Sequence, residues 1–214
     1  MIWRVERHRG PARLFHEREL PDPAVRAAWV HQVDRPALVL GSAQDAAVVD
    51  ADAARAAGVE VVRRRSGGGA VLLVPGEVLW VDVVIPAGDP LWDADVGRAA
   101  WWLGAVWAEA LGGGAVVHRG SLVTTPWSRL VCFAGLGPGE VTDAGRKLVG
   151  ISQRRTRQAA RFQCALYARW DPAALAALLA LDESRRATLV ADLADVVGTA
   201  ALDADGFLAA LERR

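Results

Sequence analysis

The sequence contains little cysteine, almost no lysine and no long apolar run. Its two cysteines, Cys132 and Cys164, form no Cys-x-x-Cys pair, which argues against a disulfide framework and a structural zinc site. The longest apolar stretch, residues 70–85, is interrupted by a Pro-Gly pair and two acidic residues, which excludes a transmembrane helix there. Acidic and basic residues number 25 each, so no net field draws the chain to nucleic acid or to a membrane. We therefore expect neither as a partner, and no metal site.

The 214 residues, of which 52% are hydrophobic, are enough to enclose the core of one large domain. Residues 1–7 are charged and lack the apolar segment of a signal peptide. Together with the scarce cysteine, this predicts a cytoplasmic location.

The scarcity of lysine singles out one position. Of the 25 basic residues, 24 are arginine, and the remaining one is Lys147. Lysine is a compact point charge, whereas arginine is a planar fork. A lone lysine therefore indicates a site that the fork does not fit, or a surface lysine that survived by chance.

Apolar periodicity predicts a mixed α/β (α+β) fold, with a mostly antiparallel sheet and packed helices. Strands are expected at residues 36–40, 59–63, 115–118, 129–134, 147–152 and 162–170, and helices at 44–57 and 91–111. Residues 70–74 and 78–85 are expected to form an antiparallel pair. In the second of them, Asp82 shares a face with Trp80 rather than with polar residues. Residues 171–214 are expected to form a helical C-terminal cap on the same core.

The strongest local signal is the run Arg-Arg-Arg-Ser-Gly-Gly-Gly-Ala-Val at residues 63–71. Consecutive glycines let the main chain approach a ligand and offer it N–H groups, and the arginines can bind an anion. The run matches neither a Walker A loop nor a dinucleotide-binding loop. A glycine-rich hairpin with solvated arginines is the structural alternative. The candidate binding residues are Arg64, Arg65, Ser66, Gly67, Gly68, Gly69 and Ala70.

A second signal surrounds the lone lysine, in the segment Gly-Arg-Lys-Leu-Val-Gly-Ile-Ser-Gln-Arg-Arg at residues 145–155. In a strand here Lys147, Val149 and Ile151 would share one face, where the ammonium could stabilise a carbonyl or anionic oxygen, and the glycines would permit close approach of a ligand. Gly150 and Ser152 are further candidate binding residues. None of the four histidines has a catalytic spacing, and His118 is the one nearest to the expected strands.

The two motifs, in this order and some 80 residues apart, resemble the lipoate–protein ligase family, which shares its catalytic domain with biotin–protein ligases and octanoyltransferases. The similarity covers roughly residues 36–170. It implies a class II aminoacyl-synthetase-like fold over one catalytic domain, residues 1–214. By resemblance, the segment from Ser66 to Ala70 lines the acyl pocket, Arg64 and Arg65 flank the anionic end, and Lys147 contacts the activated carbonyl or phosphate oxygens.

The resemblance also implies the partners and cosubstrates. The acceptor would be a lysine of a lipoyl carrier domain, from the E2 component of a 2-oxoacid dehydrogenase or from the glycine-cleavage H protein. A ligase would use ATP and Mg²⁺ with lipoate or octanoate. A transferase would take the acyl group from acyl carrier protein.

The chain departs from the family pattern at several places. Leu72-Leu73 stands where ligases carry a His-Asp pair, and Gly135-Leu136-Gly137-Pro138 stands where they carry an Asn-Asp pair. In addition, Cys132 lies 15 residues before Lys147, as in one group of octanoyltransferases whose cysteine takes the acyl chain as a thioester. The alternative is a small buried cysteine, which is also how we interpret Cys164.

Three hypotheses follow from these residues. We favour an ATP-dependent lipoate–protein ligase because of the triple glycine. The alternatives are a cysteine-dependent octanoyltransferase that uses Cys132, and a non-catalytic protein that binds an acyl group or a carrier domain. Biotin ligation is disfavoured because no Gly-Arg-Gly-Arg-type loop is present.

Overall fold

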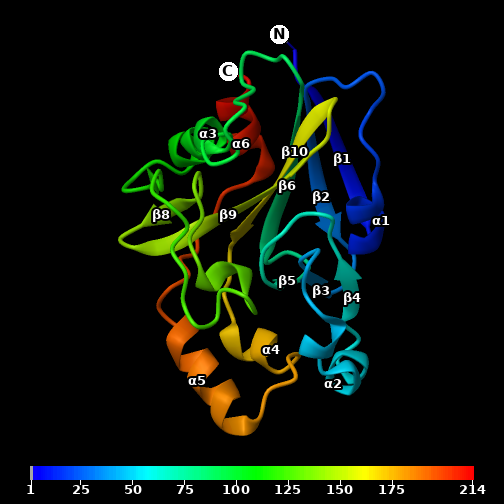
Figure 1. Cartoon of the computed structure of the whole chain (residues 1–214), viewed down its shortest axis with the longest axis vertical. Helices are drawn as coiled ribbons and strands as arrows, with labels where there is room; N and C mark the ends of the chain where they lie inside the picture. Colours follow the sequence, from blue (N-terminus) through cyan, green and yellow to red (C-terminus); the bar gives the residue numbers. More distant parts are fainter. Residues whose placement is uncertain (1) are drawn as a thin grey trace.

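A large and a small β-sheet lie side by side in the molecule (Figure 1). The computed structural model describes residues 2–214. Neighbouring strands of the large sheet are antiparallel, except that β1 and β2 are parallel. In spatial order this sheet consists of β1 (Arg4–Gly10), β2 (Ala27–Val33), β6 (Val78–Pro86), β10 (Ala159–Tyr167), β9 (Arg146–Arg155), β8 (Val141–Asp143) and β7 (Val116–Val117).

The small sheet has three strands. Its central strand β3 (Ala37–Leu40) pairs in parallel with β4 (Glu60–Arg63) and antiparallel with β5 (Val71–Leu73). The helices are α1 (Ala12–Glu17), α2 (Ala51–Ala56), α3 (Trp101–Leu111), α4 (Pro172–Ala176), α5 (Glu183–Leu193) and α6 (Ala204–Leu211), with short 3₁₀ helices η1 (Ala46–Val48) and η2 (Cys132–Ala134). None of the helices within residues 2–214 is long and apolar enough to cross a bilayer.

The helices divide between two apolar clusters. Helices α3 and α6 pack together against one face of the large sheet, where the rings of Trp107 and Phe207 lie 4.1 Å apart. Helices α4 and α5 pack beside the small sheet, where Leu175 and Leu189 join Leu38 in one cluster. The segment 171–214 therefore contacts both clusters; that it is a cap of a single catalytic domain stays a prediction.

The opposite face of the large sheet turns towards the small sheet. Along β6, Val81 and Val83 point into the cluster that contains α3, whereas Trp80 packs with Val39 and Leu73 of the small sheet. This alternation confirms that Asp82 and Trp80 share a face, because the Trp80 Nε1 donates a hydrogen bond to Asp82 Oδ1 at 2.8 Å. The face they share borders the space between the two sheets.

The mixed, mostly antiparallel α/β architecture is confirmed, but one expected strand pair is wrong. Residues 71–73 pair with β3 in the small sheet, while residues 78–86 lie in the large sheet between β2 and β10. Both edges of β6 are occupied, so β5 has no place beside it. The Pro75-Gly76 turn thus carries the chain from one sheet to the other.

Two expected helices are shorter than predicted, and aspartates explain both differences. The expected helix at 91–111 begins only at Trp101, because Asp93 Oδ1 accepts from the N–H of Asp95 and Asp95 Oδ1 accepts from that of Gly97, each at 2.8 Å. Such local bonds compete with helical ones. The expected helix at 44–57 is divided into η1 and α2, whose N-caps are the side chains of Asp45 and Asp50.

The expected strand at 129–134 is also wrong. Residues 132–134 form η2, and Val131 makes a single parallel bridge with Ala70. Residues 1–35 carry no motif that predicts an element, but the structure has β1, α1 and β2 there.

Candidate functional site

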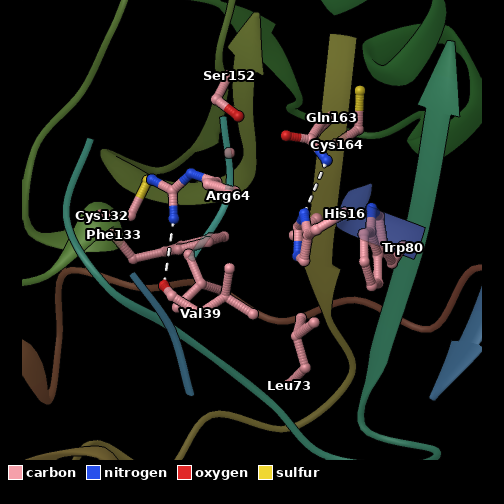
Figure 2. Close-up of a pocket in the computed structure, with 13 residues that line it drawn as sticks. His16, Val39, Arg64, Leu73, Trp80, Cys132, Phe133, Ser152, Gln163 and Cys164 are labelled. Carbon is pink, nitrogen blue, oxygen red and sulfur yellow. Dashed lines mark hydrogen bonds between the residues drawn. The ribbon is translucent and has the colours of Figure 1, made fainter. Parts of the chain in front are cut away.

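A pocket of about 420 Å³, including its open mouth, lies between the two sheets. Ligand pockets typically combine apolar walls with a few polar groups. Figure 2 shows the pocket with its walls from both sheets. It is lined by Val39, Val71 and Leu73 from the small sheet, by Trp80, Gly150, Ser152, Gln163, Cys164 and Ala165 from the large sheet, and by His16, Arg64, Cys132 and Phe133.

The glycine run packs closely against the backbone that leads to Cys132. An added Cβ at Gly69 would lie 2.6 Å from the carbonyl carbon of Val131, so only glycine fits there. Next to it, the Ala70 N–H donates to the Leu130 carbonyl at 2.8 Å, and the Cys132 N–H donates to the Ala70 carbonyl at 3.0 Å. The run therefore positions Cys132. Gly67, Gly68, Gly69 and Ala70 do not line the pocket among the residues that the structure describes.

Arg64 is buried and fastens the glycine run from inside. Its guanidinium donates to the carbonyls of Gly67 and Gly69, at 2.7 and 2.8 Å, and to that of Val39 at 3.2 Å. An added Cβ at Gly68 would lie 2.8 Å from Arg64 Nη2 and 3.5 Å from Cys132 Sγ, so both atoms border the same small space. Burial lowers the pKa of Arg64, and the neighbouring Cys132 counteracts part of this effect.

Arg65 does not reach the pocket. Its side chain is exposed and pairs with Glu19 at 2.7 Å. The resemblance placed it beside Arg64, but the side chains of consecutive residues in extended backbone point to opposite sides.

Ser66 connects the glycine run to the large sheet. Its hydroxyl donates to Gln163 Oε1 and lies 2.9 Å from the hydroxyl of Ser152, which is the register partner of Gln163 on the adjacent strand. The Gln163 amide in turn donates to His16 Nδ1 at 3.1 Å. The neutral His16 ring therefore carries its proton on Nε2, which has no hydrogen-bond partner among residues 2–214. Figure 2 shows that ring edge turned towards Leu73.

Lys147 is buried, with 4% of its side chain exposed, and all three of its N–H donors are used. The Nζ donates to the carbonyls of Cys132 at 3.1 Å and Gly135 at 3.0 Å. It also pairs with Glu140 Oε2 at 2.6 Å. Three acceptors around one point suit an ammonium and not a planar fork, which explains why this position alone is lysine. Lys147 does not line the pocket; contact between its amine and the acyl oxygens stays a prediction.

The two cysteines have different surroundings. Cys132 lies at the start of η2, where it lines the pocket. Cys164 is fully buried among the large-sheet cluster, and burial raises the pKa of its thiol strongly. In Figure 2 its sulfur points away from the pocket. Cys164 therefore has the core position expected of it, and Cys132 is the accessible thiol.

A fully buried carboxylate lies behind the Trp80 wall of the pocket. Asp82 accepts from Trp80 Nε1, from Arg161 Nε at 2.9 Å and lies 3.3 Å from His31 Nε2. Burial alone would raise the pKa of Asp82, but Arg161 and His31 outweigh it and hold that pKa far below its usual range. Asp82 thus orients Trp80 and Arg161, not Lys147 or Arg64.

The sequence motifs missed several pocket residues. His16 and His31 lie close to the site, whereas His118 does not line the pocket. His16 comes from α1, in a segment without motifs, and no local signal identifies it. Gln163 could have been found, because it is a polar residue within the apolar run 159–167 of β10.

A comparison with protein-family models matches residues 12–201 to the lipoyl protein ligase A/B catalytic domain. The chain belongs to this family. It is therefore an enzyme with a lipoate–protein ligase-like catalytic domain, as the motifs predict. A search among curated proteins finds no match.

Solved structures of lipoate–protein ligases share the fold. The bipartite lipoate protein ligase of Thermoplasma acidophilum, studied with its E2 lipoyl domain, is 18% identical over 99% of this chain and 80% of its own, with a TM-score of 0.69. Ta0514 from the same organism, a putative lipoate protein ligase with bound lipoic acid, is 19% identical over 99% and 82%, with a TM-score of 0.67. A lipoate-protein ligase A bound with ATP is 18% identical over 100% and 83%, with a TM-score of 0.64. At these identities the likeness establishes the family fold.

Removing one partner of the buried Lys147–Glu140 pair should destabilise the protein more than breaking an exposed ion pair. In the Lys147→Ala variant a buried carboxylate loses its partner, so the free energy of unfolding should fall by about 3–5 kcal/mol. Lys147→Arg should also destabilise, because the fork cannot reach all three acceptors. Denaturant unfolding measures both. Arg169→Ala, which breaks the exposed pair with Glu77, is the control and should cost less than ~1 kcal/mol; equal losses in Lys147→Ala and the control would contradict the assignment.

His16 should make stability depend on pH. Burial lowers the pKa of His16 to about 3. Below pH 6.5 the His16 ring is therefore protonated in the unfolded chain but stays neutral in the folded chain. The free energy of unfolding should fall by about 2 kcal/mol from this residue between pH 6.5 and 5. Chemical unfolding at a series of pH values should show a smaller decline in His16→Phe than in the wild type. An unchanged decline would mean that His16 is not held neutral.

Proposed function

We propose that this enzyme transfers a medium-chain acyl group, octanoyl or lipoyl, to a lysine of a lipoyl carrier domain through a thioester on Cys132. One observation carries the choice of the thioester route: Cys132 lines the pocket beside the Arg64 guanidinium, while the Lys147 amine is engaged by Glu140 and two carbonyls. The spacing of 15 residues between Cys132 and Lys147 is the one that the resemblance associates with cysteine-dependent octanoyltransferases.

The site residues fit two successive acyl transfers. In the first, the Cys132 sulfur attacks the thioester carbonyl of an acyl donor such as acyl carrier protein. A bond from this sulfur to the acyl carbon forms, the donor's carbon–sulfur bond breaks, and the donor leaves as a thiol with the proton that the Cys132 thiol releases. In the second, the carrier lysine attacks the acyl-Cys132 carbonyl, an amide forms, and Cys132 leaves as a thiol with the proton that the amine releases. Both steps place negative charge on the acyl oxygen, which a nearby guanidinium stabilises.

The pocket walls suit the chain itself. The apolar side chains of Val39, Val71, Leu73, Trp80 and Phe133 line the pocket. Burial contributes about 0.8 kcal/mol for each methylene, so an eight-carbon chain would gain most of its affinity here. The carrier partner is inferred from the relative that was studied with its E2 lipoyl domain; a glycine-cleavage H protein offers the same kind of lysine.

A covalent adduct tests the thioester route. Incubation with octanoyl–acyl carrier protein in the absence of ATP should add one octanoyl group to the wild type, as read by intact-protein mass spectrometry and mapped to Cys132. Cys132→Ala should form no adduct and should lose transfer to apo carrier domain by more than ~100-fold, whereas Cys164→Ala should keep both. Wild-type rates in Cys132→Ala would remove the thioester route.

An ATP-dependent lipoate–protein ligase is the second candidate, favoured by the triple glycine and by the relatives bound to ATP and to lipoic acid. The segment 135–138 is less favourable, because the Gly135 carbonyl and the Gly137 N–H are bound internally to Lys147 and Glu140. No cluster of three or more His, Cys, Asp or Glu side chains suited to a metal occurs within residues 2–214. Mg²⁺ would then enter with the nucleotide phosphates.

The ligase route makes a separate prediction. With lipoate, ATP, Mg²⁺ and apo carrier domain, a ligase forms lipoyl adenylate and lipoylates the carrier even in the Cys132→Ala variant. We expect no adenylate, measured as pyrophosphate release. Pyrophosphate release that depends on lipoate and survives in Cys132→Ala would replace the transferase with the ligase.

A further inference from the structure

A second hollow lies on the far side of the pocket wall that Trp80 and Leu73 form. It encloses about 1340 Å³, part of it open to solvent, against about 420 Å³ for the pocket. Leu73 and Trp80 are the two residues that line both spaces. In Figure 2, Cys132 and Trp80 lie on opposite sides of the pocket, so the shared wall is remote from the proposed reacting sulfur.

The hollow exists because two strands of the large sheet separate there. The pairing of β2 with β6 ends at His31 and Trp80, although β2 continues to Val33 and β6 begins at Val78. No ladder of hydrogen bonds closes the sheet beyond that point. Apolar side chains, among them Val33, Leu79 and Leu166, line the opening together with the charged residues Arg7, Arg9, Asp203 and Asp205.

The wall between the two spaces is rigid. Trp80 is buried, and its Nε1 is fixed by the bond to Asp82 at 2.8 Å. Its ring stacks on His16 with centroids 4.6 Å apart and meets the Phe15 ring edge-on at 5.6 Å. Leu73 is also buried, on a strand whose register is set by pairing with Ala37. A chain that reaches this wall cannot pass without breaking these contacts.

We propose that Trp80 and Leu73 set the maximum length of the acyl chain, so that the enzyme accepts medium-chain acyl groups and excludes long-chain fatty acyl groups. Without these side chains the pocket and the second hollow become one channel with room for a longer chain. The inference rests on the proposed function only in taking the ligand to be an acyl chain; it does not depend on the Cys132 thioester.

Binding of free saturated fatty acids from six to sixteen carbons tests the wall without any turnover. In the wild type, the dissociation constant measured by isothermal titration should fall as the fatty acid lengthens up to a medium length. For longer fatty acids it should stay constant or rise. In Leu73→Ala and in Trp80→Ala, affinity should continue to increase by up to ~4-fold for each further methylene. Leu79→Ala is the matched control, because Leu79 lines the second hollow but not the pocket. This variant should keep the wild-type length limit.

The outcomes separate this inference from the proposed function. Circular dichroism checks folding, and if Trp80→Ala does not fold, Leu73→Ala decides. Three outcomes would contradict the proposal that Trp80 and Leu73 limit the chain length. They are a wild-type affinity that rises steadily up to sixteen carbons, an unchanged length limit in the folded Leu73→Ala and Trp80→Ala variants, and no binding of any fatty acid. A shift of the length limit in the variants, together with no acyl adduct on Cys132, would support the role of Trp80 and Leu73 and contradict only the thioester route.

Discussion

The buried ammonium of Lys147 is the interaction on which the site depends. It joins the carbonyl of Cys132, the carbonyl of Gly135 and the carboxylate of Glu140, which lie on segments without a regular ladder of their own. Glu140 Oε1 in turn accepts from the N–H of Ile151 on β9. The irregular chain around η2 is thereby attached to the large sheet through one charge pair. This attachment fixes the position of the Cys132 sulfur.

The glycine run supplies the opposite support. Because Gly69 has no side chain, its backbone contacts the backbone of Val131. Arg64 donates to the Gly67 and Gly69 carbonyls, which make no hydrogen bonds within a sheet. A motif that sequence reasoning associates with ligand binding thus also has a packing role. The glycine run does not line the pocket itself, and its contact with ligand stays a prediction.

Sequence reasoning predicted the parts whose signal is local. The strands around Val39, Val62 and Val149, the buried Cys164 and the family follow from apolar runs and from two motifs. It could not predict which sheet receives β5, because β-strand pairing is decided by distant edges rather than by the turn between strands. The aspartates at 93 and 95 end a helical pattern through side-chain bonds that periodicity does not reveal. His16 reaches the pocket from α1 only because the two sheets meet there.

Lys147 and Arg64 are buried cations near Cys132, and their hydrogen bonds decide which of them could contact an acyl oxygen. Lys147 has no donor left for an acyl oxygen unless Glu140 or a carbonyl releases it, and such a release would free the segment that carries Cys132. A ligase that used Lys147 on an adenylate would have to loosen this support during catalysis. Arg64 lies beside the sulfur with its orientation fixed by the carbonyls of Val39, Gly67 and Gly69, and these bonds leave one Nη1 donor for an acyl oxygen. Under the proposed thioester route, the Arg64 charge would already be fixed beside the sulfur, which is the condition under which a charge lowers a barrier most effectively.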